Sequence, residues 1–223
     1  MERSAYKIYC AGPLFNPMER EEMGRIASVL EKAGYSVFLP QRDGLEFAEL
    51  FPLFLEKGIP AQEAQRILNM AIFSLDVFQI ADSEGLLLNM NGRVPDEGAM
   101  VEAGIAWAHD KVIVIFRSDS RSLIEGNCNP LVVGLSDFSL VDDYADITHA
   151  FDTRFAVMAE REMLGRDRGC EAATKSGKEI SDYLASQRSR GDIADLLIDL
   201  FRERIWQASR DLKGSCSQAS TQP

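Results

Sequence analysis

Residues 6–17 of the chain read YKIYCAGPLFNP. The first six residues form a short β-prone run that ends at Gly12 and Pro13, so they predict a strand. Asn16 is a favourable N-cap, and Pro17 suits the first turn of the helix that would follow. A strand that passes directly into a helix predicts the start of an α/β fold, in which parallel strands alternate with helices.

The same alternation continues outward from this stretch. Apolar spacing and turn residues predict a first helix to residue 33, strands at 35–40, 85–89 and 111–116, and helices at 45–57, 61–79 and 96–109. We therefore expect a Rossmann-like or flavodoxin-like parallel sheet flanked by helices. Ligands of such sheets bind beyond the carboxyl ends of the strands, which selects the loops at 11–16, 40–44, 89–98 and 117–130.

The composition changes near residue 145. Residues 1–144 are expected to form the α/β domain. Residues 145–212 predict a helical C-terminal extension, with helices at 145–163, 170–188 and 192–208. Residues 213–223 are rich in Ser, Gln and Thr, which is typical of a disordered tail. We expect the extension to pack on the core or on a neighbouring subunit rather than to take part in catalysis.

Several partner classes are disfavoured by composition. The net charge of −11 argues against a nucleic-acid partner. No apolar run approaches the roughly 18 residues that cross a bilayer, and no signal-peptide core is visible, so a cytoplasmic protein without a membrane partner is expected. The scattered cysteines and two histidines give no metal-ligand spacing. Without a GxGxxG motif, no cofactor is expected. The net negative charge suits an enzyme that acts on a neutral small molecule.

Glu102 is the only charged residue between Gly98 and Ala108. The residues around it make the predicted helix apolar on nearly every face, as in buried helices. A carboxylate there is costly unless it is partnered or used, and burial raises its pKa. Taken alone, Glu102 is as consistent with a structural acid as with a functional one.

Three other acids accompany Glu102. Asp96 begins the same helix and is explained by N-capping alone. Asp43 lies in a turn, and Asp82 precedes a strand, where a solvated turn acid is common. The predicted topology nevertheless places Asp43, Asp96, Glu102 and the turn at Gly12 at one edge of the sheet. Cleavage of a glycosidic bond uses two carboxyl groups, one below the anomeric carbon and one at the leaving group.

Four segments together resemble the nucleoside 2-deoxyribosyltransferase family. They are IYCAGPLF at residues 8–15, the Ala81-Asp82 pair, the Asp-x-Gly-x-x-x-Glu-x-Gly motif at 96–104 and NPLVVGLSD at 129–137. The order and spacing match over roughly residues 6–140.

The resemblance implies roles for individual residues. Glu102 matches a nucleophile that attacks C1′ of a 2′-deoxynucleoside and forms a covalent deoxyribosyl-enzyme. Tyr9 matches the residue that orients this carboxylate, and Asp82 matches the acid that helps to protonate the leaving base. Asp96 matches a contact to the sugar and base region. Asn129 matches a residue that binds the 5′-hydroxyl from a neighbouring subunit, so a homo-oligomer with shared active sites is implied.

The remaining substrate-binding candidates are Gly12, Phe15, Asp43 and Gly98. The two glycines belong to the matching motifs, and Asp43 lies on a strand-end loop. The ring of Phe15 could stack on a base, although aromatic residues with such spacing are more often part of a core.

These roles predict transfer of deoxyribose from one nucleobase to another, or to water. Two displacements at C1′ would give net retention. Two alternatives remain open. A hydrolase of 2′-deoxynucleoside 5′-monophosphates would need a cation such as Arg42, Arg93 or Arg117 at the 5′ position. A non-catalytic nucleotide-binding module is the other alternative, because a fold does not establish activity.

Overall fold

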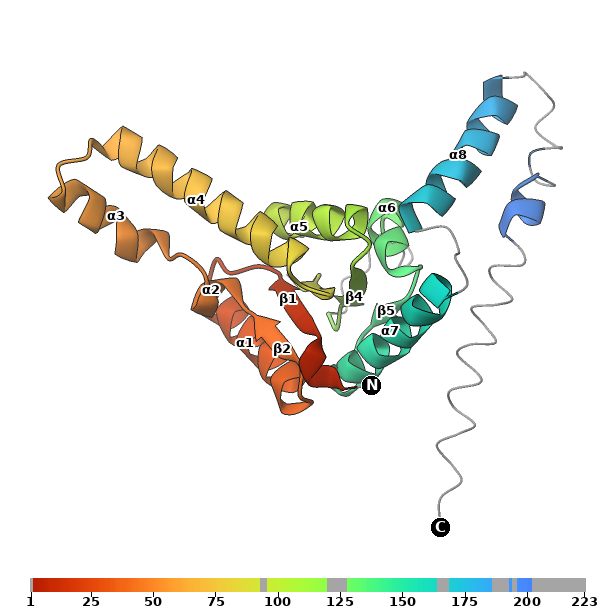
Figure 1. Cartoon of the computed structure of the whole chain (residues 1–223), viewed down its shortest axis with the longest axis horizontal. Coiled ribbons are helices and arrows are strands. Elements are labelled where there is room, and N and C mark those ends of the chain that lie inside the picture. The colour runs from red at the N-terminus through yellow and green to blue at the C-terminus, as the bar shows by residue number, and fades with distance from the viewer. Residues whose placement is uncertain are drawn as a thin grey trace, which may run out of the picture. The chain divides into compact units, whose positions relative to one another are not determined.

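The structure is a computed structural model that describes residues 2–92, 96–119, 128–163, 169–185, 193 and 196–201. The chain divides into two compact units, Met1–Arg166 and Asp167–Pro223. The first unit contains the parallel sheet (Figure 1). From the second unit, one long helix is described, α8 at Gly169–Ala185. Only residues 193 and 196–201 of the predicted helix at 192–208 are described, and the predicted tail at 213–223 lies outside the described residues.

The sheet has five parallel strands in the order β2-β1-β3-β4-β5. Their bounds are β1 Lys7–Ala11, β2 Ser36–Phe38, β3 Gly85–Asn89, β4 Val112–Phe116 and β5 Leu140–Val141. The predicted parallel α/β fold is confirmed, and β5 is an addition that the sequence did not indicate. This order is the flavodoxin-like one, which places the ligand-binding crevice at the carboxyl ends of β1 and β3.

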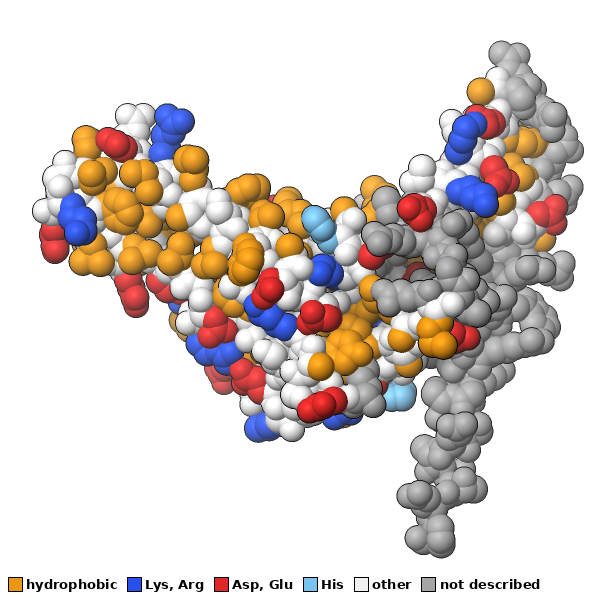
Figure 2. All heavy atoms as spheres, in the orientation of Figure 1, with side chains coloured by type: hydrophobic (Ala, Val, Ile, Leu, Met, Phe, Trp, Pro, Cys, Tyr) orange, Lys and Arg blue, Asp and Glu red, His pale blue; other side chains and the backbone are white. Residues whose placement is uncertain are grey.

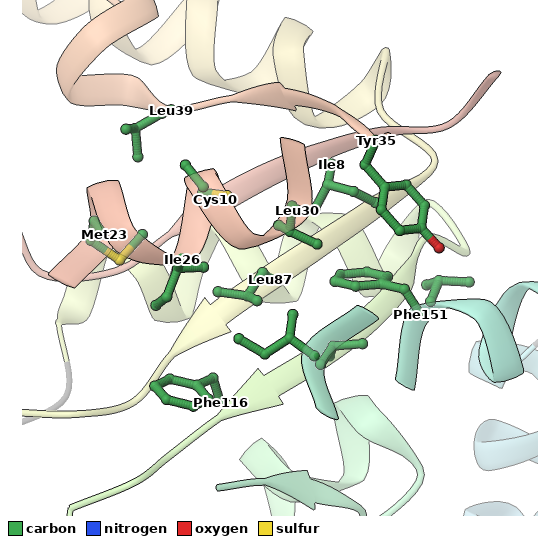
Figure 3. Packing of buried hydrophobic residues seen from close by; sticks show 14 of the residues in the cluster. Ile8, Cys10, Met23, Ile26, Leu30, Tyr35, Leu39, Leu87, Phe116 and Phe151 are labelled. Carbon is green, nitrogen blue, oxygen red and sulfur yellow. The ribbon is translucent and has the colours of Figure 1, made fainter. Parts of the chain in front are cut away.

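Helices cover both faces of the sheet. Helices α1 (Pro17–Lys32) and α7 (Ile147–Met163) pack on one face, where alternate strand residues such as Ile8, Cys10 and Leu87 are buried (Figures 1 and 3). Helices α4 (Ala61–Ala81) and α5 (Glu97–Ala108) cover the other face, on which Tyr9 and Leu86 lie. Because successive strand residues point to opposite faces, Tyr9 is directed away from α1 and toward α4 and α5.

Helix α7 belongs to the α/β unit. Its residues Ile147 and Phe151 are fully buried and Phe155 is 5% exposed, all in the same core as β3 and β4. A Cβ at Gly85 would lie 2.9 Å from Cε1 of Phe151, so the glycine allows the helix to approach β3 closely. The compact unit therefore ends at Arg166 and includes α7, which the composition assigned to the C-terminal extension.

The loop between β1 and α1 is held by a capping box. The side chain of Asn16 accepts a hydrogen bond from the backbone N–H of Glu19 at 3.0 Å, and the Glu19 carboxylate accepts in return from the N–H of Asn16 at 3.3 Å and from that of Phe15 at 2.8 Å. Just before this loop, Gly12 packs tightly, since a Cβ there would lie 2.6 Å from Sδ of Met23. The carboxyl end of β1 is therefore firmly placed.

Helices α3 and α4 contact each other and form a hairpin that follows β2 (Figure 1). Helix α3 spans Phe47–Glu56, and a short α2 at Pro40–Asp43 precedes it, where a loop was predicted. Exposed apolar side chains gather on the hairpin (Figure 2), namely Leu53, Leu55, Ile67, Met70, Phe73 and Phe78. None of the described helices is both long and apolar enough to span a bilayer.

Short elements complete the first unit: η1 Arg3–Ala5, α6 Pro130–Val133, η2 Gly134–Ser136 and η3 Tyr144–Asp146.

Candidate active site

Tyr9 and Glu102 form the centre of the site. Tyr9 lies in the middle of β1, is fully buried, and stacks on Phe38 with ring centroids 5.5 Å apart. Its hydroxyl donates a hydrogen bond of 2.7 Å to Oε1 of Glu102 on α5. Because the tyrosine ring is held by the core, this bond fixes the direction of the carboxylate. The predicted contact between Tyr9 and Glu102 is present in the structure.

The environment of Glu102 favours its protonated form. The pKa of Glu102 is raised to about 7. Burial is the main cause, the hydrogen bond from Tyr9 opposes the increase, and the carboxylates of Asp76 and Asp96 add to it. A carboxyl group with this pKa changes its charge near neutral pH. Such a perturbed acid, partly open to solvent and beside other acids, is typical of a functional site.

Asp76 is the acid that the sequence interpretation missed. It is partly buried on α4 and close enough to the Tyr9 hydroxyl to interact with it. Burial raises the pKa of Asp76, while the interaction with Tyr9 lowers it. The hydroxyl of Tyr9 thus lies between two carboxyl groups. Burial, followed by the charge of Glu102 and that of Asp76, holds the pKa of Tyr9 far above its usual value.

A signal for Asp76 was present in the sequence. It is the only charged residue from Ile67 to Ala81, in a helix that is otherwise mostly apolar. The criterion that selected Glu102 on α5 would have selected Asp76 on α4.

Asp82, which the resemblance assigns to protonation of the leaving base, lies at the end of α4 where the strands begin. Asp82 is the C-cap of α4, and its side chain is 52% exposed. Its carboxylate accepts a hydrogen bond of 2.8 Å from Nζ of Lys7, which lowers the pKa of Asp82. Lys7 is the first residue of β1, so this ion pair lies where the strands begin. Asp82 follows Asp76 by more than a helical turn, roughly 9 Å further along the helix axis.

Asp96 is the expected N-cap of α5 and also acts electrostatically on Glu102. Its side chain caps α5 by accepting a hydrogen bond of 2.7 Å from the N–H of Ala99. Its charge also contributes to the raised pKa of Glu102. Gly98 suits this arrangement, because a Cβ there would lie 3.0 Å from Oδ1 of Asp96. The start of α5 therefore brings Asp96 and Glu102 into one electrostatic group.

Gly12 and Phe15 lie on the loop that follows β1. Gly12 stands at the carboxyl end of the strand, where a Cβ would meet Cβ of Asn89 at 2.9 Å, so β1 and β3 approach closely there. The side chain of Phe15 is 79% exposed. It is therefore not part of the core, which was the alternative explanation for this aromatic residue.

Asp43 is engaged by its own short helix. Its Oδ2 accepts a hydrogen bond of 2.8 Å from the N–H of Leu39, and both oxygens receive hydrogen bonds of 2.9 Å from Arg42. These contacts account for the carboxylate structurally. Asp43 thus lies at the predicted edge of the sheet, and its hydrogen bonds stabilise the short helix α2.

Asn129 is the N-cap of α6 and is exposed. Its side-chain oxygen accepts a hydrogen bond of 2.9 Å from the N–H of Leu131, which leaves the amide NH₂ as a donor. Leu131 beside it is 83% exposed. Within the described residues, no group of three or more His, Cys, Asp or Glu side chains is arranged to hold a metal ion.

A family model described as nucleoside 2-deoxyribosyltransferase matches residues 8–174. The chain belongs to this family. The family match begins in β1, includes Tyr9, Asp76, Asp96 and Glu102, and extends into α8. It therefore reaches further along the chain than the resemblance seen from the sequence motifs.

Two 2-deoxyribosyltransferases are among the solved structures that resemble this chain. The one from Bacillus psychrosaccharolyticus is 20% identical, with 63% of this chain and 89% of that chain covered and a TM-score of 0.46. The one from Leishmania mexicana is 18% identical, with 70% and 97% covered and a TM-score of 0.42. A CMP N-glycosidase from Clostridium botulinum is 16% identical, with 66% and 98% covered and a TM-score of 0.39. Among curated proteins no significant match is found.

Proposed function

We propose that the protein is a nucleoside 2-deoxyribosyltransferase, which moves 2-deoxyribose from one nucleobase to another and can also release it to water. The observation that carries this proposal is the partly buried Glu102, held by the buried hydroxyl of Tyr9 and accompanied by Asp76 and Asp96. Family membership supports the same chemistry.

In the first step, an ionised Glu102 attacks C1′ of the deoxynucleoside. Its Oε1 is occupied by the hydrogen bond from Tyr9, so we assign the attack to Oε2. A bond forms between Oε2 and C1′ while the bond from C1′ to the base nitrogen breaks, and the electron pair of that bond stays on the base. The negative charge of Glu102 also stabilises the positive charge that develops on the sugar.

The leaving base requires a proton, and we assign its donation to Asp76 instead of Asp82. Burial raises the pKa of Asp76, which favours the protonated form that a general acid needs. Asp82 is exposed and paired with Lys7, which holds its carboxyl group in the ionised form. In the second step, an incoming base or water gives up a proton to Asp76 and attacks C1′ from the side that the first base left, while the bond between C1′ and Oε2 breaks and Glu102 leaves as a carboxylate. Two inversions retain the configuration of the sugar.

The charges in the site favour a nucleoside over a nucleoside monophosphate. Asp76, Asp96 and Glu102 form an acidic group that would repel a phosphate dianion. Among the cations considered for a phosphate, Arg42 is held by Glu31 at 2.8 Å and by Asp43. Arg117 contacts Asp119 and Cys128, and Arg93 lies outside the described residues.

The proposal is tested by base exchange. The protein is incubated with 2′-deoxyinosine and free adenine, and the products are separated by liquid chromatography. We expect 2′-deoxyadenosine and hypoxanthine to form together. Hypoxanthine without a new nucleoside would show hydrolysis instead of transfer. Turnover of deoxynucleoside monophosphates without turnover of deoxynucleosides would overturn the proposal.

We also propose that copies of the chain share active sites, with Asn129 serving the site of a neighbour. The exposed NH₂ of Asn129 is suited to bind a 5′-hydroxyl, and the exposed apolar side chains of the α3–α4 hairpin provide a surface for association. Asn129→Asp removes this donor but keeps the oxygen that caps α6.

Mixing an inactive Glu102→Ala variant with an Asn129→Asp variant is therefore expected to restore part of the activity. Each mixed pair of subunits would contain one site with both native residues. The measurement is base exchange before and after subunit exchange, which is followed with two fluorescent labels. Confirmed subunit exchange without recovery of activity would refute the shared site.

A further inference from the structure

Glu22 on α1 is the centre of a polar network at the carboxyl end of the sheet. Its Oε2 accepts a hydrogen bond of 2.9 Å from Nδ2 of Asn89. Its Oε1 accepts one of 2.7 Å from Nδ2 of Asn91 and one of 3.0 Å from the hydroxyl of Tyr144. Asn89 and Asn91 are only 1% and 7% exposed. Three donors from separate elements therefore converge on a single carboxylate.

The network continues through Asn91 into the loop that follows β4. The side-chain oxygen of Asn91 accepts hydrogen bonds from the N–H groups of Ser118 at 2.8 Å and Asp119 at 3.1 Å. In return, Oδ2 of Asp119 accepts a hydrogen bond of 3.0 Å from the N–H of Gly92. Asn89 adds a bond by accepting from the N–H of Asn91 at 3.0 Å. The segments after β3 and β4 are thus tied to each other and to α1.

This network lies on the face of the sheet opposite Glu102, next to the strand ends that lead to the residues we assign to substrate binding. Asn89 ends β3 and packs against Met23 of α1, so it lies on the face of the sheet opposite Glu102. The segment held at Gly92 leads along the chain to Asp96, and the segment held at Asp119 leads to Asn129. Glu22 therefore holds, through Asn91, the residues from which the chain continues to the two sugar-binding candidates.

We propose that Glu22 is a positioning residue for the reaction. Acting through Asn89 and Asn91, it fixes the strand ends from which the segments bearing Asp96 and Asn129 begin. This inference rests on the proposed function for the roles of Asp96 and Asn129. Glu22 itself does not contact the substrate. Its loss affects binding of the sugar and not the reactivity of the nucleophile.

Glu22→Gln is the decisive variant. A glutamine side chain replaces one acceptor oxygen with an NH₂ group, which would face an NH₂ or hydroxyl donor in this network. Turning Asn89 over would not relieve the conflict, because its oxygen is needed by the N–H of Asn91. A buried donor is left without a partner, so the loops are expected to shift. We expect KM for the deoxynucleoside to rise about tenfold, with kcat and its pH profile nearly unchanged.

Two further variants separate positioning from general stability. Tyr144→Phe removes one donor to Glu22 and is expected to raise KM less. Tyr35→Phe removes a similar partly buried hydroxyl, which donates to Asp152 at 2.8 Å where the strands begin. It is expected to lower the melting temperature about as much as Tyr144→Phe, with an unchanged KM. If Glu22→Gln kept the native KM, or if Tyr35→Phe raised KM equally, the inference would be overturned.

Hydrogen exchange provides a readout that does not depend on turnover. In Glu22→Gln, the amides of Asn91, Ser118 and Asp119 are expected to exchange faster than in the native protein, while those of β1 keep their protection. Native protection of these three amides in the variant would overturn the role of Glu22 as a positioning residue. Absence of base exchange by the native protein would instead reject the proposed function, so the two failures are distinct.

Discussion

Glu102→Gln is expected to abolish base exchange, with kcat lowered by roughly four orders of magnitude or more. Glutamine has nearly the same shape and can still accept the hydrogen bond from Tyr9. It cannot form the covalent bond to C1′ or supply the negative charge that stabilises the sugar cation. Single-turnover assays with a deoxynucleoside, combined with mass spectrometry of the native protein quenched in acid, would detect both the loss and the deoxyribosyl adduct. A variant with near-native turnover would refute the nucleophile assignment.

The same variant is expected to fold, and the pH dependence of its free energy of unfolding should differ from that of the native protein because Glu102 is buried. Burial raises the pKa of Glu102 from 4.5 to about 7, so the folded state binds the proton more tightly than the unfolded state. The stability that this group contributes is therefore present below its ordinary pKa and is lost as the pH rises through about 7. Glutamine does not titrate. Urea unfolding is expected to show that Glu102→Gln gains stability relative to the native protein between about pH 5 and about pH 8.

Asp76→Asn is expected to lower kcat by about 100-fold to 10,000-fold, which is the range for loss of a general acid. The asparagine side chain cannot protonate the leaving base. Asp82→Asn makes the same chemical change on an exposed residue where the strands begin, and its turnover is expected to stay near the native value. The assay is base exchange by the two variants and the native protein under identical conditions.

A substrate whose base needs no proton distinguishes an acid from a structural residue. The base of 7-methyl-2′-deoxyguanosine carries a positive charge and leaves without protonation. Asp76→Asn is expected to cleave this nucleoside at close to the native rate, whereas Glu102→Gln stays inactive on it. Equal losses on both kinds of nucleoside would contradict a proton-donating role. If Asp82→Asn lost most of its turnover while Asp76→Asn kept the native rate, Asp82 would be the acid that protonates the leaving base.

The fold could be predicted well because its signals are local. Apolar runs, caps and turn residues give β1, β3, α1 and α5 to within one residue or so of their observed ends. Strand β5 was missed because it contains only Leu140 and Val141, too short to show any periodicity. The position of β1 between β2 and β3 depends on contacts between distant segments, which a single sequence does not display.

The site was predicted in part. Tyr9, Asp96 and Glu102 lie together because two of them share a helix and the third faces that helix from the sheet. The resemblance assigned the leaving-group acid to Asp82 from the order of the Ala81-Asp82 pair along the chain, whereas Asp76 is the acid on α4 that interacts with Tyr9. Which acid reaches Tyr9 depends on where α4 packs and on which side of the helix Asp76 lies. A match of two adjacent residues shows neither.

The two edge strands of the sheet are very short. Strand β2 has three residues and β5 has two, so the sheet presents few unpaired backbone N–H and C=O groups at either side. Long, exposed edges invite strand pairing between molecules and lead to aggregation. With so little edge available, association between copies of this chain through strand pairing is disfavoured relative to association through helices and side chains. Such contacts can be specific and finite, whereas extension of a sheet from molecule to molecule has no natural end.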